Sequence, residues 1–222
     1  MSRSLALLED ALQSSGLKIL GCFHTEEEST LVLIGNAGPE MWRAFETSGY
    51  DERNPNPLDD WSRRTIEKAA ERLSYDLQCP ISALFPFDGP PYHPFQRWAT
   101  RSGNAFPTPI GPLLHPEYGM WHAYRGALCI ECPLELPVNI VSTSPCATCA
   151  DKSCLETCPV DAFTTEGYDV SACLDLLEKE PVGECFSTGC MARKACPVGQ
   201  EFIYEKAQAR FHMEKFLKAH RS

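Results

Sequence analysis

The sequence predicts an α+β protein, with an α/β domain over residues 1–140, a small cysteine-rich module over 141–200 and a C-terminal helix over 201–222. Strand-like apolar runs alternate with amphipathic helical segments in the first 140 residues, as in domains that cover a sheet with helices. Eight of the twelve cysteines then fall between Cys146 and Cys196, in a segment with little periodicity. We therefore expect cysteines, rather than a large core, to hold this module together.

The composition disfavours several classes of protein. With 222 residues, of which 43% are hydrophobic, the chain can bury a core, so general disorder is not expected. The formal net charge of −10 disfavours nucleic acid and anionic membranes as partners, because both bind clustered Lys and Arg. No apolar run approaches the roughly 18 residues of a membrane span, and the acidic N-terminal stretch is typical of a helix rather than a secretory signal. We therefore expect a cytoplasmic protein.

The chain is predicted to begin with a helix and a strand. Leu5, Leu8 and Leu12 follow helical spacing, and Gly16 ends the helix. The run TLVLI at 30–34 is β-branched and apolar and is closed by Gly-Asn, which is typical of a buried strand.

Two helices and a second strand follow. The segment EMWRAFETS has Pro39 before it and is predicted as a helix with Pro at its first turn. WSRRTIEKAAERL at 61–73 is predicted as an amphipathic helix with Asp59 or Asp60 as its N-cap. The segment 81–87 is predicted as a strand.

The remaining segments are less regular. Residues 88–119 are dense in Pro and Gly, with a short helix at 96–101, and a long irregular stretch of this kind is usually functional. Residues 120–134 are predicted as one or two strands, and residues 201–220 as the terminal helix.

The eight clustered cysteines form two groups that each end in Cys-Pro-Val, which indicates an internal duplication. In a reducing cytosol, such groups bind metal more often than they form disulfides. In bacterial two-cluster ferredoxins, three nearby cysteines hold one [4Fe–4S] cluster and the cysteine before Pro reaches the other. On this pattern one cluster is held by Cys146, Cys149, Cys154 and Cys196, and the second by Cys158, Cys173, Cys185 and Cys190.

Zinc is the alternative metal, but zinc sites usually pair two Cys-x2-Cys knuckles, and within the module only Cys146 and Cys149 have that spacing.

The scattered cysteines are expected to be small buried residues. Two of them are expected in one strand, where an i, i+3 pair faces opposite sides of the sheet and is poorly placed to share a metal. The scattered cysteines are Cys22, Cys79, Cys129 and Cys132, and the strand pair is Cys129 and Cys132.

The segments PFQRWATRSGNAF and LLHPEYGMWHAYRGALCIECPLELP resemble the epoxyqueuosine reductase family, which places a two-cluster ferredoxin module directly after this region, as here. HPEYGMWHAYRGALC and NPLDDWSRRTIEKAAERL also resemble the cobalamin-processing chaperone family of the cblC type. Both families share a nitroreductase-like α/β fold that holds cobalamin in place of flavin. The resemblance covers about residues 50–222. It implies a cobalamin pocket in residues 1–140, beside a ferredoxin-like module that supplies electrons.

The resemblance also implies roles for four residues. Asp88 falls near the Asp that donates a proton in the reductases, although Asp-Gly-Pro is also an ordinary turn sequence. Arg125 matches an Arg-Gly position that helps to bind a thiol cosubstrate in the chaperone family, and the alternative is an ion-paired strand residue. His115 and Tyr118 match a His-Pro-x-Tyr/Phe-Gly motif, so they are expected either to contact the cofactor or to form a structured turn beside its pocket.

These features together predict a cobalamin-dependent or cobalamin-processing reductase. Two [4Fe–4S] clusters would pass electrons to cobalamin, with Asp88 as the catalytic residue. The expected partners are an electron-donor protein and a small-molecule or corrinoid substrate, whereas the acidic charge disfavours tRNA. Two alternatives remain: a ferredoxin-type electron-transfer protein whose first domain only docks a partner, and a zinc-stabilised interaction protein.

Overall fold

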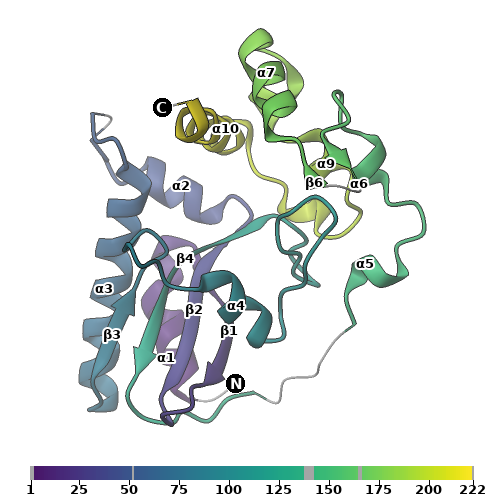
Figure 1. Cartoon of the computed structure of the whole chain (residues 1–222). Coiled ribbons are helices and arrows are strands. Elements are labelled where there is room, and N and C mark those ends of the chain that lie inside the picture. Colours follow the sequence, from purple (N-terminus) through teal and green to yellow (C-terminus); the bar gives the residue numbers. More distant parts are fainter. Residues whose placement is uncertain (1–2, 52, 138–142, 165–166, 222) are drawn as a thin grey trace. The chain divides into compact units, whose positions relative to one another are not determined.

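The computed structural model of the chain describes residues 3–51, 53–137, 143–164 and 167–221. Helices and a sheet are both present, which confirms the predicted α+β class (Figure 1). No described helix combines the length and the apolar character that a membrane span requires.

The chain divides into two compact units. Unit 1 consists of residues 1–105 and 122–142, and unit 2 consists of residues 106–121 and 143–222. This division differs from a single break at residue 140, because the irregular segment 106–121 groups with the cysteine-rich part of the chain.

Unit 1 is built on a four-stranded antiparallel sheet in the order β1-β2-β4-β3. β2 (Thr30–Ala37) lies between β1 (Leu17–His24) and β4 (His122–Ile130), and β3 (Ile81–Leu84) pairs with the other side of β4. Every residue of β2 is buried, which accounts for the apolar run from Leu31 to Ile34. The strand predicted at 30–34 is confirmed and extends further towards its C-terminus.

Among its described residues, unit 1 contains four α-helices: α1 (Arg3–Leu12), α2 (Glu40–Glu46), α3 (Pro57–Leu77) and α4 (Phe95–Arg101). All four were predicted from the sequence. α1 buries Leu5, Leu8 and Leu12, and the short 3-10 turn after it is closed by Gly16 with a positive φ of 66°. The predicted helix stop at this glycine is therefore confirmed.

α3 is the longest helix of unit 1 and contacts α1, β3 and β4. It begins earlier than predicted, because Asn56 is the N-cap residue and Pro57 takes the first helical position. The predicted capping by Asp59 or Asp60 is thus wrong. Both carboxylates instead lie in the first turn, where their negative charge interacts favourably with the positive end of the helix dipole.

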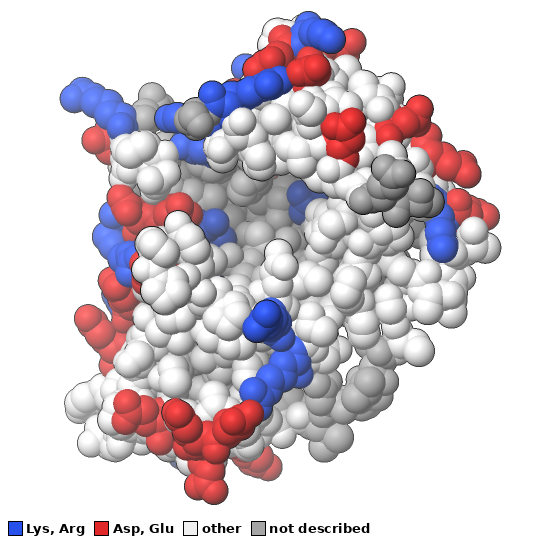
Figure 2. Space-filling model, in the orientation of Figure 1, with Lys and Arg blue, Asp and Glu red and all other residues white. Residues whose placement is uncertain are grey.

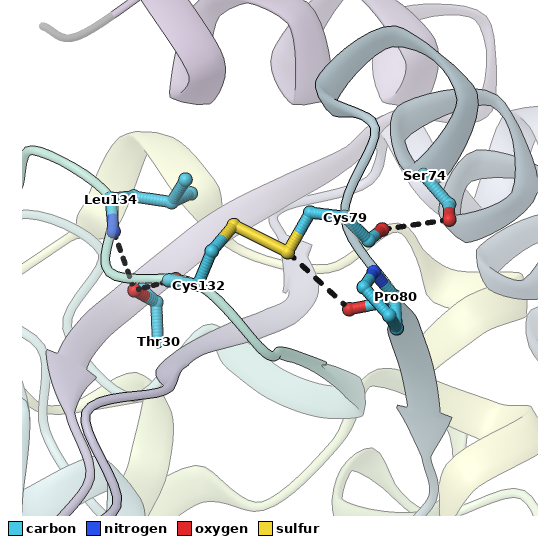
Figure 3. Close-up of a disulfide and its surroundings, with 6 residues drawn as sticks. All are labelled: Thr30, Ser74, Cys79, Pro80, Cys132 and Leu134. Atoms are coloured by element: carbon cyan, nitrogen blue, oxygen red, sulfur yellow. Dashed lines mark hydrogen bonds between the residues drawn. A yellow bond between two sulfur atoms is a disulfide. The ribbon is translucent and has the colours of Figure 1, made fainter.

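A disulfide joins Cys79 to Cys132 in unit 1 (Figure 3). The Cα atoms are 6.4 Å apart, within the range that a disulfide spans. The pairing of β3 with β4 brings the two cysteines together, because one precedes β3 and the other follows the end of β4 at Ile130. The expectation that these two cysteines are simply small buried residues, and that Cys132 lies within the strand, is therefore wrong.

Unit 2 contains short elements and one long helix. The elements are α5 (Pro145–Thr148), α6 (Ser153–Glu156), β5 (Phe163–Thr164), β6 (Gly167–Tyr168), α7 (Val170–Lys179), α8 (Glu184–Thr188), α9 (Met191–Lys194) and α10 (Lys206–Arg221). The terminal helix is confirmed as α10, which contacts α7 and α8. Its last residue Arg221 forms ion pairs with Asp175 at 2.6 Å and Glu178 at 2.9 Å on α7.

Charged side chains of both signs are interspersed on the face of the molecule shown in Figure 2. Acidic side chains gather in the lower part of this view, where β1 turns into β2. The sequence of this turn contains Glu26, Glu27 and Glu28, and all three are exposed.

Candidate functional site

Four cysteines of unit 2 line one cavity of about 270 Å³. They are Cys146, Cys149, Cys154 and Cys196, the set predicted to hold one cluster. Short helices position them, since Cys146 lies in α5, Cys149 follows α5 and Cys154 lies in α6. Cys196 follows α9, and the Pro197-Val198 sequence after it forms another part of the wall.

The thiols of this first set influence one another electrostatically. Burial raises the pKa of Cys146 and of Cys154, and the charge of Cys196 adds to the rise in both. Cys149 also contributes to the rise at both thiols. Four sulfurs that repel one another as thiolates around one cavity are suited to an electropositive group, because bound metal offsets this repulsion.

The remaining four cysteines form a second set, composed of Cys158, Cys173, Cys185 and Cys190. Burial raises the pKa of Cys173, Cys185 and Cys190. The charge of Cys158 adds to the rise at Cys173 and Cys185, and that of Cys185 adds to the rise at Cys190. The two sets therefore have the same members as the two groups of ligands predicted from the sequence, while cluster binding itself stays a prediction. Among the described residues, no three His, Cys, Asp or Glu side chains are grouped as the ligands of a single metal ion.

Several donors point at the sulfurs of the second set. The backbone N–H of Ala162 donates to the sulfur of Cys158 at 3.4 Å. Burial raises the pKa of Cys185 and Cys190, and hydrogen bonds from the backbone of residues 191–193, on α9, partly offset this rise. Burial also raises the pKa of Cys173, and a hydrogen bond from the hydroxyl of Tyr168 on β6 partly offsets it. Such donors stabilise negative charge on a sulfur ligand and tune the potential of a bound cluster.

The segment 106–121 forms part of the cysteine-rich unit. Ile110, Leu114 and Met120 are buried in one cluster with Ala192 and Cys196. Isolated bridges between Phe106 and Leu114 and between His115 and Gly119 fold the segment back on itself. The irregular stretch noted in the sequence therefore supplies apolar wall to the first cysteine set.

Arg193 fastens this segment to α9. Its Nε donates to the carbonyl oxygen of Met120 at 3.0 Å, and its guanidinium lies 4.4 Å from the ring centre of Trp121 and 4.6 Å from that of Tyr204. The two rings also contact each other edge-on, with centres 5.4 Å apart, and a guanidinium over aromatic rings is a favourable cation–π arrangement. No local pattern points to this residue, because Met120 and Trp121 are distant from it in the chain.

His115 and Tyr118 form a turn in unit 2. Their rings stack with centres 4.4 Å apart, and the Nδ1 of His115 accepts the backbone N–H groups of Glu117 at 3.1 Å and Tyr118 at 3.3 Å. Burial lowers the pKa of His115 to about 4, so the ring is neutral near pH 7. These contacts agree with the structured-turn alternative, and a role in cofactor binding stays a prediction.

Asp88 and Arg125 lie in unit 1, and each forms an ion pair with α3. Asp88 contacts Arg63, and the hydrogen bond between them is the main reason why the pKa of Arg63 is raised. Arg125 contacts Asp59 at 2.5 Å and donates to the hydroxyl of Ser62 at 3.0 Å, and its side chain is only 12% exposed. Arg125 is thus an ion-paired strand residue, and its role in binding a thiol cosubstrate stays a prediction.

The partners of these residues were missed as site residues, although helical spacing offered a signal. Asp59, Ser62 and Arg63 are separated by three and four positions, so they share one face of α3. The predicted site residues are divided between the units, since His115 and Tyr118 lie in unit 2.

No protein-family model matches the sequence, and no curated protein sequence matches it significantly. Solved structures are similar. CblC from C. elegans, a B12-trafficking protein and homologue of human MMACHC, is 16% identical with a TM-score of 0.57, over 95% of this chain and 90% of that chain. Epoxyqueuosine reductase from Bacillus subtilis is 16% identical with a TM-score of 0.52, over 90% of this chain and 66% of that chain. The same enzyme from Streptococcus thermophilus is 13% identical with a TM-score of 0.54, over 92% of this chain and 68% of that chain. The chain thus shares the fold of these proteins and spans about two thirds of the length of the reductases.

Proposed function

We propose that the chain is a cobalamin-dependent or cobalamin-processing reductase that carries two [4Fe–4S] clusters in unit 2. The observation that carries the proposal is that the last cysteine of each group in the sequence lies beside the cysteines of the other group. Cys196, which precedes a proline, neighbours Cys146 and Cys154, and Cys158, which precedes the other proline, neighbours Cys173 and Cys185. This is the arrangement found in bacterial two-cluster ferredoxins.

The residues of unit 2 suit this role. Eight thiols supply the ligands, and the apolar side chains of Leu114, Met120 and Val198 line the same cavity as the first set. When bound, [4Fe–4S] clusters supply one-electron transfer at potentials that hydrogen bonds to the sulfurs adjust. Donors to the second set include Ala162 and Tyr168.

The cobalamin part of the proposal is supported by the shared fold. One similar structure is described as a B12-trafficking protein and two as epoxyqueuosine reductases. Under the proposal, unit 1 binds a corrinoid, with Arg125 as a candidate contact and Asp88 as the candidate proton donor. His115 and Tyr118, the other contacts predicted from the sequence, belong to unit 2. An electron-donor protein reduces the clusters, and basic redox proteins suit the acidic chain.

The test of the cluster proposal is anaerobic purification and reconstitution of the full chain. We expect about eight iron and eight sulfide ions per chain, a brown sample, and electron paramagnetic resonance signals of two reduced clusters. The variant Cys154→Ser should lose close to half of the iron, and Cys185→Ser should lose the other half. The matched control Cys22→Ser changes a cysteine outside both sets and should keep all of it. A colourless sample that contains zinc would refute the cluster proposal.

The cobalamin proposal needs a separate titration. The reconstituted protein is reduced by dithionite, freed of excess dithionite by anaerobic gel filtration, mixed with hydroxocobalamin or methylcobalamin, and followed by absorbance. We expect saturable spectral changes of the cobalamin and its reduction by the clusters. A protein with full clusters that leaves every cobalamin spectrum unchanged would refute this part alone.

A ferredoxin-type electron-transfer protein is the second candidate. It is favoured by the ion pairs of unit 1, because both Asp88 and Arg125 are engaged with α3. This alternative predicts normal reduction and reoxidation of the clusters by a partner protein and no binding of cobalamin.

A further inference from the structure

We propose that unit 1 carries a separate anion-binding groove that takes a phosphorylated small molecule of nucleotide size. The groove has a volume of about 720 Å³ and lies among α1, α3 and the segment that follows α2. All of its lining residues fall between Asp10 and Arg72, so neither cysteine set, nor Asp88, nor Arg125 contributes to it. Its volume falls within the range of roughly 300–1,000 Å³ that is usual for small-molecule sites.

α3 supplies three cations to this groove from successive turns, namely Arg64, Lys68 and Arg72. Arg72 has a partner, since its guanidinium lies 2.7 Å from the carboxylate of Asp10. Within the described residues, Arg64 and Lys68 have neither a hydrogen bond nor an ion pair, and both are exposed. Helical residues four positions apart have Cβ atoms about 5–6 Å from each other, so the two charges can contact one phosphate group or two adjacent ones.

The groove has an excess of positive charge in a chain whose formal net charge is −10. Its carboxylates are Asp10, which Arg72 neutralises, and Asp51, which accepts the backbone N–H of Arg53 at 2.9 Å. Among the described lining residues, three cations face these two carboxylates, and Arg72 also lies 3.9 Å from Asp76. The positive charge left for a ligand is therefore that of Arg64 and Lys68. A cleft in which one sign of charge predominates concentrates ligands of the opposite sign.

Neutral donors and an aromatic surface complete the groove. In the part of the chain that the structure describes, the hydroxyls of Ser14 and Tyr50 have no hydrogen-bond partner, and both residues line the groove. The Tyr50 ring is held in place by stacking on Phe45, with ring centres 4.1 Å apart. Trp61 lines the same groove.

This combination indicates the class of ligand. Arg and Lys bind phosphate oxygens by charge-assisted hydrogen bonds, and hydroxyls add neutral ones. The aromatic side chains offer a surface for a planar ring. Inorganic phosphate would fill only a small part of 720 Å³, so a phosphate ester with a ring fits better.

The experiment is isothermal titration calorimetry of the reconstituted full chain with ADP, and with adenosine and pyrophosphate as separate probes. We expect saturable binding of ADP, weaker binding of pyrophosphate and the weakest binding of adenosine. The double variant R64Q/K68Q should weaken ADP binding by about tenfold or more, because two charged donors are lost. Its circular dichroism should match that of the wild type, since both side chains are exposed and have no partner within the described residues.

Two further variants make the test specific. The control R97Q/K206Q removes the same charge from exposed positions on α4 and α10 and should change ADP affinity less than twofold. Asp10→Asn removes a carboxylate from the groove and should tighten ADP binding. No saturable binding of any of the three probes, or equal weakening by the two double variants, would overturn the proposal. Neither result would affect the iron content or the cobalamin titration, so the two proposals fail separately.

Discussion

The guanidinium of Arg193 lies 4.4 Å from the ring centre of Trp121, although 72 positions separate the two residues in the sequence. The same side chain donates to the carbonyl oxygen of Met120. Because Trp121 is buried and belongs to the segment 106–121, this contact ties that segment to the cysteine-rich part of unit 2.

Replacing Arg193 should destabilise unit 2. Arg193→Ala removes a cation–π contact and a hydrogen bond to a buried carbonyl, which together are worth about 2 kcal/mol. In anaerobic thermal unfolding we expect the midpoint to fall by about 4 to 8 °C. The control Lys194→Ala removes the neighbouring cation and a surface ion pair with Glu184, which is worth at most about 1 kcal/mol. Equal shifts in the two variants would contradict the role given to Arg193.

Gly119 lies so close to the backbone of Val198 that a side chain at this position should destabilise unit 2. Gly119 has a positive φ of 57°, and a Cβ placed there would overlap the carbonyl oxygen of Val198. Gly119→Ala should therefore separate the segment 106–121 from the Cys-Pro-Val sequence and lower the free energy of unfolding by about 2 kcal/mol or more. Gly111 is a matched control, since its φ of 100° is also positive but an added Cβ meets nothing within 4 Å. If Gly111→Ala is as destabilising as Gly119→Ala, backbone strain alone explains the effect and the close approach is unimportant.

The buried imidazole of His115 predicts a dependence of stability on pH. Burial lowers its pKa to about 4, below the ordinary value of 6.5, so the folded state favours the neutral ring. This contribution is fully present above about pH 6.5 and is lost as the pH falls towards 4. Nuclear magnetic resonance of the ring should give an apparent pKa near 4, and His115→Asn should flatten the decline of stability between these pH values. A ring that titrates near pH 6.5 would show that His115 is not buried in the folded protein.

Secondary structure was predictable where the spacing of apolar residues and the residues that end the segment indicate the same helix or strand. The run from Thr30 to Ile34 and the amphipathic pattern of α3 are of this kind. β1 was not predicted, because Lys18 and Gly21 interrupt its apolar pattern and the strand pairing shifts between Ile19 and Gly21.

The site was predictable only where the signal is local. The spacing of cysteines and the two Cys-Pro pairs give the same two sets of neighbours as the structure. The contribution of Ile110, Leu114 and Met120 to the core of unit 2 has no local signal, since these residues follow no helical or strand period. Tertiary contacts decide such packing, and a single sequence does not reveal them.

The disulfide gives a prediction for unit 1. Cys79 and Cys132 are separated by 53 positions, and a cross-link that closes a loop of this length stabilises a fold by up to about 4 kcal/mol through the entropy of the unfolded chain. The double variant C79A/C132A should therefore unfold at a lower urea concentration than the wild type. Cys22→Ala, which changes a free and half-buried cysteine, is the control for the loss of a sulfur atom. Dithiothreitol should destabilise the wild type and leave the double variant unchanged, and a wild type insensitive to it would indicate that the disulfide does not form.

The hydroxyl of Tyr168 predicts a difference between the two clusters. Its hydrogen bond to Cys173 stabilises the added negative charge of a reduced cluster, so it raises the reduction potential of the second cluster. Tyr168→Phe keeps the ring that stacks on Phe163, 4.9 Å away between centres, and removes only the donor. A hydrogen bond worth about 1 kcal/mol corresponds to about 40 mV for a one-electron couple, so the potential of the second cluster should fall by about that amount. Potentiometric titration followed by electron paramagnetic resonance measures both clusters. Tyr204→Phe, which changes a tyrosine outside both cysteine sets, should shift neither potential, and a shift of the first cluster in Tyr168→Phe would contradict the assignment of Cys173 to the second.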